Sequence, residues 1–477
     1  MSDTPTGRLF FQSETFRVEA SSARIRHPRV TARHLTEPAR EVPIHAECDV
    51  LVVGGGPAGT AAAVAAARLG ARTMLLERHN HLGGLSTGGL VIWIDRMTDW
   101  SGQLVIRGFA EEYLARLPRD AIAGPPREAW GSRDAATAAW WALRTAAFHG
   151  TVTHSPTADP EWMKATALEM VIEAGAEPLF HAWGAQPVME GGAFRGAIFE
   201  SKQGRRAILA KVVVDATGDG DLFHRAGAAT TADIEEADIH HAMNTSWMFG
   251  GVDMEAWLRW RAGEPEQFAE FLQRGREAHG QFDKAFVSWR NDVALFMGPR
   301  MTGFSAVAVD DLTEVEIRSH RLMRAHLEFY RAHAPGFAGA WPLLSAPQLG
   351  VRHARRLVGA GAVARAMWDG RVSPDEIGVS PPLSPRFLNI SIPYGALVPA
   401  QLDGLLAPGR HLSCDATSHS FLREIPQCWL TGQAAGIAAA LSADRSITPR
   451  SLPTRDVQRA LLAHGVYLSP EVTALAA

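Results

Sequence analysis

The hydrophobic pattern is clearest between residues 50 and 76. Residues 50–53 form an apolar run with the length and β-branched character of a buried parallel strand. Residues 60–69 are rich in alanine and end at Gly70, which predicts a helix with a glycine stop. Residues 72–76 form a second apolar run. The pattern therefore predicts a strand, a helix and a strand in direct succession, as in a parallel sheet.

The remaining elements are marked by two kinds of pattern. Helices show apolar residues at helical spacing with acids early and a glycine at the end. Strands show short apolar runs bounded by turn residues. The predicted helices are 159–175, 426–441 and those within the amphipathic stretches 253–280 and 313–333, and the predicted strands are 177–183, 186–200, 205–215, 392–400 and 405–414. Gly191-Gly192 marks a hairpin turn.

This order indicates an α/β fold in which one domain interrupts another. A length of 477 residues is well beyond one ordinary domain. The predicted parts are an N-terminal arm (1–46), a discontinuous nucleotide-binding domain (47–235 plus 386–445), an inserted α+β substrate or cap domain (236–385) and a C-terminal tail (446–477).

Three glycines after the first strand carry the strongest chemical signal. Gly54, Gly56 and Gly59 have the G-x-G-x-x-G spacing, in which the first glycine permits a sharp turn. The second lets backbone approach a pyrophosphate, and the third lets the helix pack closely on the strand. The helix N-terminus then faces the phosphates. Glu77 follows the second strand, where an acid usually binds a ribose 2′-hydroxyl.

Three later segments add to this dinucleotide signal. His81 to Gly89 reads HLGGLSTGG and offers backbone N–H groups and hydroxyls to phosphates or a ring edge. Residues 212–221, VVVDATGDGD, end a strand at the sheet edge where α/β proteins bind ligands. Residues 407–436 supply a further strand, an acid and a helix whose N-terminus can face a ligand.

Together these segments resemble the two-dinucleotide-binding-domain flavoproteins. More narrowly, the chain is similar to the FAD-dependent oxidoreductase family related to the flavoproteins of fumarate reductase and succinate dehydrogenase. The motifs that carry the resemblance are VVGGGPAG, LERxxxLGGxST, VVVDATGDGDL, GVRHARRLVG and GRHLS…REIPQCWLTGQAAG. The resemblance implies a Rossmann-like, glutathione-reductase-type domain that binds FAD.

The resemblance also implies which residues hold the FAD. The glycines would hold the pyrophosphate, Glu77 the adenosine ribose, Arg78 the adenine side and Asp415 the ribityl hydroxyls. A helix beginning near Pro426 would point its positive end at the flavin N1/C2=O, where negative charge develops on reduction. The full predicted set is Gly54, Gly56, Pro57, Ala58, Gly59, Glu77, Arg78, Gly83, Gly84, Ser86, Thr87, Thr217, Gly218, Asp219, Asp415 and Gln427.

Four residues are candidates for the catalytic step. His419 and Arg423 precede the closing helix and are expected near the flavin ring, where a histidine can carry a proton. Alternatively, His419 caps the turn and Arg423 pairs with Glu424. Arg352 and His353 lie in the segment that returns from the substrate domain, and catalytic and structural roles are equally open for them.

Composition limits the partners. A net charge of −4 argues against a nucleic-acid surface. The three cysteines are scattered and form no disulfide framework or zinc site. His240-His241 is more typical of a polar surface than of a metal site, so no metal is expected. No signal peptide or bilayer-spanning run is present, and a soluble cytoplasmic protein without membrane contact is predicted. His79, His81 and Cys414 are candidate covalent anchors for flavin.

The favoured hypothesis is an FAD-dependent dehydrogenase, reductase or oxidase that transfers hydride between flavin N5 and a small, partly apolar organic substrate. A flavin-dependent monooxygenase or hydroxylase is the alternative, and a non-catalytic FAD-bound subunit ranks third. Substrate identity, reaction direction, electron acceptor and assembly as a homo-oligomer stay open. The substrate information is expected within residues 236–385.

Overall fold

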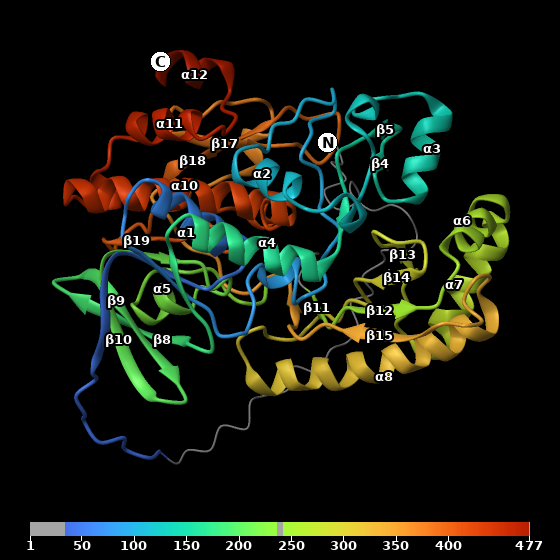
Figure 1. Ribbon diagram of the computed structural model, residues 1–477, viewed down its shortest axis with the longest axis horizontal. Coiled ribbons are helices and arrows are strands. Elements are labelled where there is room, and N and C mark those ends of the chain that lie inside the picture. The colour runs from blue at the N-terminus through green and yellow to red at the C-terminus, as the bar shows by residue number, and fades with distance from the viewer. Residues whose placement is uncertain (1–33, 236–241, 477) are drawn as a thin grey trace, which may run out of the picture.

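A parallel sheet forms the centre of the molecule. The computed structural model describes residues 34–235 and 242–476 (Figure 1). Its central strands are β7 (Glu177–Leu179), β2 (Thr73–Leu76), β1 (Ile44–Val53), β10 (Gly204–Asp215) and β19 (Leu405–Leu406), all parallel in this order. The first half of β10 pairs antiparallel with β9 (Ala193–Ser201), which pairs with β8 (Trp183–Glu190). The predicted α/β fold with a strand-helix-strand unit is therefore confirmed.

Helices α1 (Pro57–Arg68) and α10 (Ile425–Arg445) pack on each other beside this sheet (Figure 1). Their contact depends on two glycines. A Cβ atom at Gly432 would lie 2.2 Å from the Ala58 carbonyl oxygen, and one at Gly436 would lie 2.2 Å from that of Ala62. The two backbones therefore touch at these two positions, which are one helical turn apart. Helix α4 (Pro160–Glu173), capped by the Asp159 carboxylate, also contacts α1.

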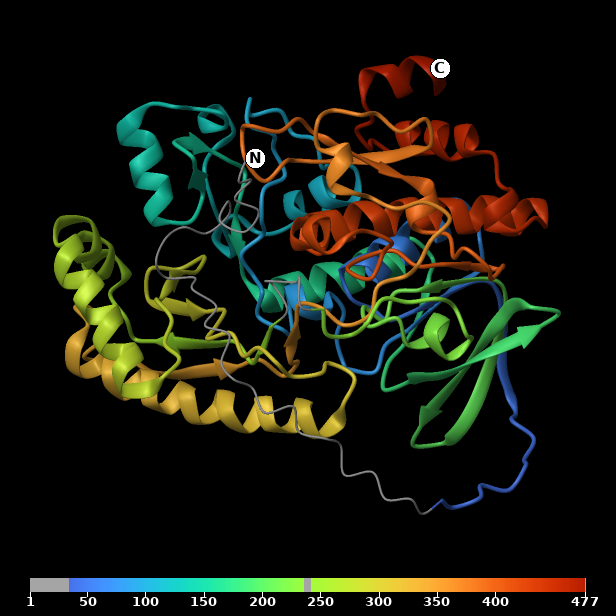
Figure 2. The same cartoon turned by 180° about the vertical axis from the view of Figure 1, so that it is seen from behind.

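A second sheet lies apart from the first. Its antiparallel strands are β13 (Phe286–Val287), β14 (Val293–Phe296), β12 (Trp247–Gly250) and β15 (Trp341–Ser345), in that order. Helix α8 (Val309–His333) runs along this sheet (Figures 1 and 2). Trp247, Trp257, Phe296 and Tyr330 are buried in one core between them. The clustered tryptophans of this region therefore build a hydrophobic core.

The structure differs from the predicted elements at several places. Of the predicted strand 392–400, only residues 392 and 393 lie in a strand, because the chain turns into a short 3-10 helix at Tyr394–Ala396. The stretch 253–280 is two helices, α6 (Met254–Gly263) and α7 (Pro265–His279), because Pro265 lacks the N–H needed to continue α6. Residues 405–414 contain only the short β19 before Pro408 and Gly409 turn the chain. Strands β17 (Glu376–Ser380) and β18 (Ile390–Pro393) pair across the predicted boundary at 385/386, and Ile377 shares a core with α10.

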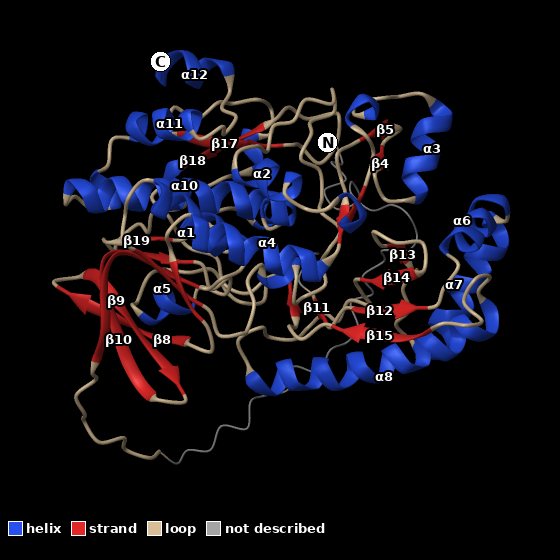
Figure 3. Cartoon of the chain, in the orientation of Figure 1, coloured by secondary structure: helices blue, strands red, loops and turns tan. Residues whose placement is uncertain are grey.

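Short elements complete the chain (Figure 3). They are α2 (Phe109–Ala115), β3 (Ile122–Ala123), α3 (Ala135–Leu143), β4 (Ala147–Phe148), β5 (Thr151–Val152), β6 (Thr157–Ala158), α5 (Asp221–Arg225), β11 (Met243–Asn244), β16 (Gly350–Val351), α9 (Ala416–Leu422), α11 (Thr454–Ala463) and α12 (Pro470–Ala476). Residues 34–43 form no regular element, and β1 already begins within the predicted arm.

Candidate cofactor and substrate site

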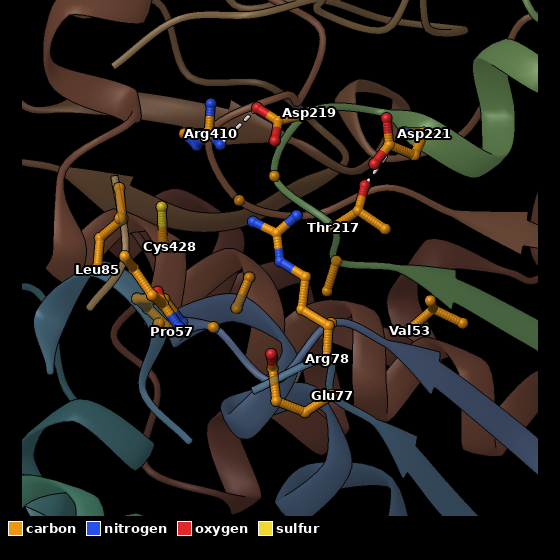
Figure 4. Close-up of a pocket in the computed structure, with 18 of the residues that line it drawn as sticks. Val53, Pro57, Glu77, Arg78, Leu85, Thr217, Asp219, Asp221, Arg410 and Cys428 are labelled. Carbon is orange, nitrogen blue, oxygen red and sulfur yellow. Dashed lines mark hydrogen bonds and ion pairs between the residues drawn. The ribbon is translucent and has the colours of Figure 1, made fainter. Parts of the chain in front are cut away.

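A first cavity opens at the carboxyl ends of β1, β2 and β10 (Figure 4). At the turn after β1, Gly54 has a φ of +102° and a Cβ on Gly59 would lie 1.7 Å from the Gly54 carbonyl oxygen. Gly56 faces open space, since a Cβ there meets nothing within 4 Å. Among the described residues, no side chain caps the N-terminus of α1 and no acid lies in its first turn. These features suit a phosphate group.

Glu77 is buried at the edge of this cavity and is held by backbone. Its Oε2 accepts the Gly55 N–H at 2.7 Å, and its Oε1 accepts the His79 N–H at 2.8 Å. Burial raises the pKa of Glu77, but hydrogen bonds from His79 and Gly55 outweigh burial and bring the pKa below its ordinary value of 4.5. Its stabilising effect is therefore present above that value and is lost as pH falls through the depressed folded pKa.

Arg78 extends from the end of β2 across the cavity towards the loop of Thr217 (Figure 4). Its guanidinium lies 5.4 Å from the ring centroid of Trp183, the first residue of β8, which also lines the cavity. This pairing places an aromatic face and a cation side by side in the wall of the cavity. The sequence carried no signal for Trp183, because only the folded sheet brings β8 next to β2.

Replacing Glu77 with glutamine is expected to weaken FAD binding about 10- to 100-fold. The amide would point an N–H donor at one of the two backbone N–H groups, and a charged hydrogen bond is worth roughly 1.5–3 kcal/mol. Fluorescence titration of the apoprotein with FAD measures the change. Glu112→Gln is the matched control, since that carboxylate pairs with Arg68 away from the cavity and its loss should leave FAD affinity unchanged. Equal affinity for Glu77→Gln and wild type would contradict this role.

Asp215 organises the loop after β10. Its buried carboxylate accepts the N–H and the hydroxyl of Thr217 on one oxygen and the N–H groups of Leu222 and Phe223 on the other. Thr217, Gly218 and Asp219 line the first cavity. Asp219 pairs with Arg410 at 2.6 Å, and Arg410 is a site residue that the sequence reasoning missed. The sequence signal that could have identified Arg410 is the Gly409-Arg410 turn directly after β19.

Several predicted cofactor residues do not line the first cavity and instead make hydrogen bonds within the protein next to it. The Ser86 and Thr87 hydroxyls donate to carbonyls within their own turn, those of Gly83 and Leu82, each at 2.7 Å. Asp415 caps α9 by accepting the Ser418 N–H, and Gln427 donates to the Ser380 hydroxyl. The described lining of the first cavity includes ten of the sixteen predicted residues, and Gly59, Gly83, Ser86, Thr87, Asp415 and Gln427 are not in it.

A second cavity of about 330 Å³ joins the first. Leu85, Val351, Arg410, Arg423 and Ile425 line both cavities. The second is walled by apolar side chains that include Val91, Trp93, Phe148, Phe286 and Met297. Ile425 is also the first residue of α10, so this helix begins at the junction of the two cavities.

The four catalytic candidates divide into two pairs. Arg423 lines both cavities and pairs with Glu424 at 3.1 Å, and Arg352 lines the second cavity. His353 and His419 are buried and do not occur in the described lining of either cavity, although their ring centroids are 5.0 Å apart. His419 Nε2 is 2.9 Å from the Arg410 carbonyl oxygen. The inward side of α9 thus directs His419 to the backbone of the loop.

The second cavity also contains charged groups that the sequence did not single out. Asp283, Lys284 and Arg300 line it. Burial raises the pKa of Asp283, although Arg300 and Lys284 oppose this. Burial lowers the pKa of Lys284 to about 8 and that of Arg300 to about 10. No motif marks these residues. His240 and His241, which the sequence marks as a polar surface rather than a metal site, lie outside the described residues.

Comparison with known families decides the class of the protein. The profile of the family described as FAD dependent oxidoreductase matches residues 49–381 and 385–461. The chain belongs to this family. It is therefore an enzyme that uses FAD, and the resemblance stated from the motifs is confirmed.

The residues at the cavity junction fit this cofactor. Arg410 Nη1 and Arg423 Nε are buried and have no hydrogen-bond partner among the described residues, so each has a donor available to an anionic or carbonyl group. Together with the open space at Gly56 and the first turn of α1, they match the pyrophosphate and the electron-rich edge of a flavin. The first cavity would hold the ADP portion of this flavoprotein's FAD, and the junction its ring.

Individual relatives are distant. The alpha subunit of sarcosine oxidase from Corynebacterium sp. (strain P-1) is 38% identical over 91 residues, which is 19% of this chain and 9% of that protein. The flavoprotein thus matches less than a tenth of this relative's length.

Two solved structures cover most of this flavoprotein. A geranylgeranyl bacteriochlorophyll reductase-like protein from Thermoplasma acidophilum has 15% identity and a TM-score of 0.45, covering 89% of each chain. GidA from Aquifex aeolicus has 13% identity and a TM-score of 0.48, covering 87% of this chain and 67% of its own. Likeness at this level carries no conclusion about the reaction. Within residues 34–235 and 242–476, no helix has the length and apolar character needed to span a membrane.

Proposed function

We propose that the protein transfers hydride between flavin N5 and a carbon atom of a small, partly apolar organic substrate bound in the second cavity. The observation that carries this proposal is the set of five residues shared by the two cavities, Leu85, Val351, Arg410, Arg423 and Ile425. A cofactor that extends from the first cavity to this junction meets a substrate in the second. The bound FAD supplies the hydride acceptor or donor.

Asp283 is the proposed proton carrier. It lines the second cavity, and the raised pKa of its buried carboxyl allows it to hold a proton at higher pH than an exposed aspartate. The Lys284 N–H donates to Asp283 Oδ1 at 2.8 Å and fixes the direction of the carboxyl group. The proton role is proposed for Asp283 because His353 and His419 do not occur in the described lining of this cavity.

His419 and His353 are proposed as positioning residues. His419 bonds to the Arg410 backbone, and the Arg356 guanidinium donates to His353 Nδ1 at 3.2 Å. Arg356 Nε in turn donates to the Cys414 carbonyl. The histidines would therefore keep the Arg410 loop and the returning segment 352–356 in place behind the flavin.

The proposed location is the cytoplasm. Cys48, Cys414 and Cys428 are buried and form no disulfide in the described part of the chain, which suits a reducing compartment. Secretion into an oxidising compartment would contradict this location, and fractionation of the source cells tests it.

Anaerobic reduction tests the proposed reaction. The purified protein is expected to be yellow, to bleach on photoreduction, and to be bleached by a true substrate in the absence of oxygen. Air should then restore the colour rapidly for an oxidase and slowly for a dehydrogenase. A product that carries an oxygen atom from O₂ would replace this proposal with a monooxygenase. A bound flavin that is reduced by light and by none of a broad panel of organic substrates would favour a non-catalytic subunit.

A further inference from the structure

The main chain at Asp283 is held by two side chains of α8. Residues 280–285 connect α7 to β13, and within this loop the Asp283 N–H donates to His326 Nε2 at 3.2 Å. The Tyr330 hydroxyl donates to the Asp283 carbonyl at 2.8 Å and accepts the Ala285 N–H at 2.9 Å. Both backbone hydrogen-bonding groups of Asp283 are therefore engaged by α8, so this helix fixes the point from which the carboxyl side chain extends.

The tautomer of His326 follows from its second contact. Its Nδ1 lies 2.8 Å from the Leu322 carbonyl oxygen, which can only accept, so this nitrogen carries the hydrogen. Nε2 of the neutral ring is then the acceptor that the Asp283 N–H requires. Burial lowers the pKa of His326 to about 3, so the ring remains a neutral acceptor above that pH.

Aromatic packing keeps both α8 side chains in place. His326 and Tyr330 are fully buried and lie one helical turn apart on the same face of α8. The ring of Phe282, the residue before Asp283, stacks on both, with its centroid 4.5 Å from that of His326 and 5.4 Å from that of Tyr330. The two rings therefore present their polar atoms to the loop from fixed positions.

Gly298 leaves room for the Asp283 carboxyl. A Cβ atom at Gly298 would lie 2.2 Å from Asp283 Oδ2, while Oδ1 accepts the Lys284 N–H at 2.8 Å. The side chain occupies this space as part of the lining of the second cavity. The positive charges of Arg300, Lys284 and Arg352 favour its ionised form, and burial opposes them. The carboxyl is thus confined by its neighbours as well as held through its backbone.

We propose that His326 and Tyr330 are positioning residues that fix the Asp283 carboxyl in the wall of the second cavity, in the space that Gly298 provides. Neither α8 residue occurs in the described lining of the two cavities, so both act through Asp283 and not on a substrate. A proton carrier must stay within hydrogen-bond reach of the reacting group, which is what a held main chain ensures. The inference rests on the proposed function, since it concerns the proton carrier of the same site.

Titration of Asp283 in the FAD-loaded protein tests the inference without a substrate. The readout is the infrared band of a protonated carboxyl, identified as the band that Asp283→Asn removes and followed from about pH 9 to pH 4. Burial raises the pKa of Asp283, so the wild-type band should appear above the ordinary value of 3.8. Tyr330→Phe and His326→Leu should each lower the midpoint by about one pH unit, a tenfold change in proton affinity, because a released loop lets the carboxyl turn towards water. Gly298→Ala should lower it as well, since the added Cβ displaces Oδ2.

Tyr113→Phe is the matched control. The Tyr113 hydroxyl is buried like that of Tyr330 and donates to the Met163 carbonyl at 2.6 Å, but it lies in a different core. Its loss should lower the Tm and leave the Asp283 midpoint unchanged, which separates positioning from a purely structural role. His326→Gln, whose amide oxygen can accept the Asp283 N–H, should recover part of the midpoint lost in His326→Leu. Tyr330→Phe keeps its ring and decides the question if His326→Leu does not fold.

Three results would overturn the inference: an unchanged midpoint in Tyr330→Phe, an equal fall in Tyr113→Phe, or no Asp283 band above the ordinary value. They are distinct from a failure of the proposed function. A protein that a substrate reduces, but whose Asp283 midpoint ignores these variants, keeps its hydride-transfer role and loses the positioning assignment. A protein whose FAD no organic substrate reduces loses the proposed function, whether or not the midpoint moves.

Discussion

Replacing Gly59 with alanine is expected to abolish FAD binding together with the native fold of the β1–α1 turn. The added Cβ would lie 1.7 Å from the Gly54 carbonyl oxygen and 3.2 Å from the Ala216 Cβ. The first of these neighbours is backbone, which has no rotamer to change, so the helix must move away from the strand. Overpacking of this kind costs ~3 kcal/mol or more. Thermal unfolding of the apoprotein should show a large drop in Tm.

Gly56→Ala is the matched variant three positions earlier. Gly56 has a φ of −68°, which alanine adopts freely, and a Cβ there meets nothing within 4 Å. The apoprotein should therefore keep its Tm, while the methyl group occupies the space proposed for pyrophosphate and FAD affinity falls at least tenfold. A Gly59→Ala protein with normal Tm, or a Gly56→Ala protein with normal FAD affinity, would contradict these assignments.

Asp215→Ala is expected to be the most damaging polar substitution near the site. It would remove the acceptor of three backbone N–H groups, those of Thr217, Leu222 and Phe223, and of the Thr217 hydroxyl. Leaving a buried donor unsatisfied costs about 1–3 kcal/mol, so the loss should reach about 3–6 kcal/mol. Urea denaturation of the apoprotein measures it.

Asp215→Asn separates the effect of charge from that of shape. The amide keeps one oxygen acceptor but directs an N–H₂ group at donors on the other side, so its stability should lie between those of wild type and Asp215→Ala. FAD affinity should fall in the same order, because Thr217, Gly218 and Asp219 all lie in the loop that Asp215 holds. Equal stability of Asp215→Asn and Asp215→Ala would show that the charge alone matters.

The cofactor half of the site follows from local sequence. Gly54, Gly56 and Gly59 lie within a few residues of one another, and each has a backbone or packing role that the residue type alone reveals. Glu77 directly follows β2, the strand that comes after α1, so its place beside the glycine turn also follows from the βαβ unit. These roles were predictable because contacts between adjacent elements of a βαβ unit are fixed by its geometry.

The substrate half does not follow in this way. Asp283, Arg300 and Arg352 come from separate segments around the second sheet, and tertiary packing alone brings them to one cavity. The catalytic role of His419 stays a prediction. The residue lies before α10 in the chain, but position along the chain does not fix which side of a short helix such as α9 its side chain occupies.

The glycine contact between α10 and α1 has a consequence for how the apoprotein behaves. Gly432 touches the Ala58 carbonyl in the first turn of α1, and Ile425, two turns earlier in α10, lies at the cavity junction. Backbone contact therefore ties the first turn of α1 to the helix whose first residue lies at the cavity junction. We expect this contact to set the separation of the two helix ends in the apoprotein, so that FAD uptake requires little ordering of the protein and its entropic cost falls on the ligand.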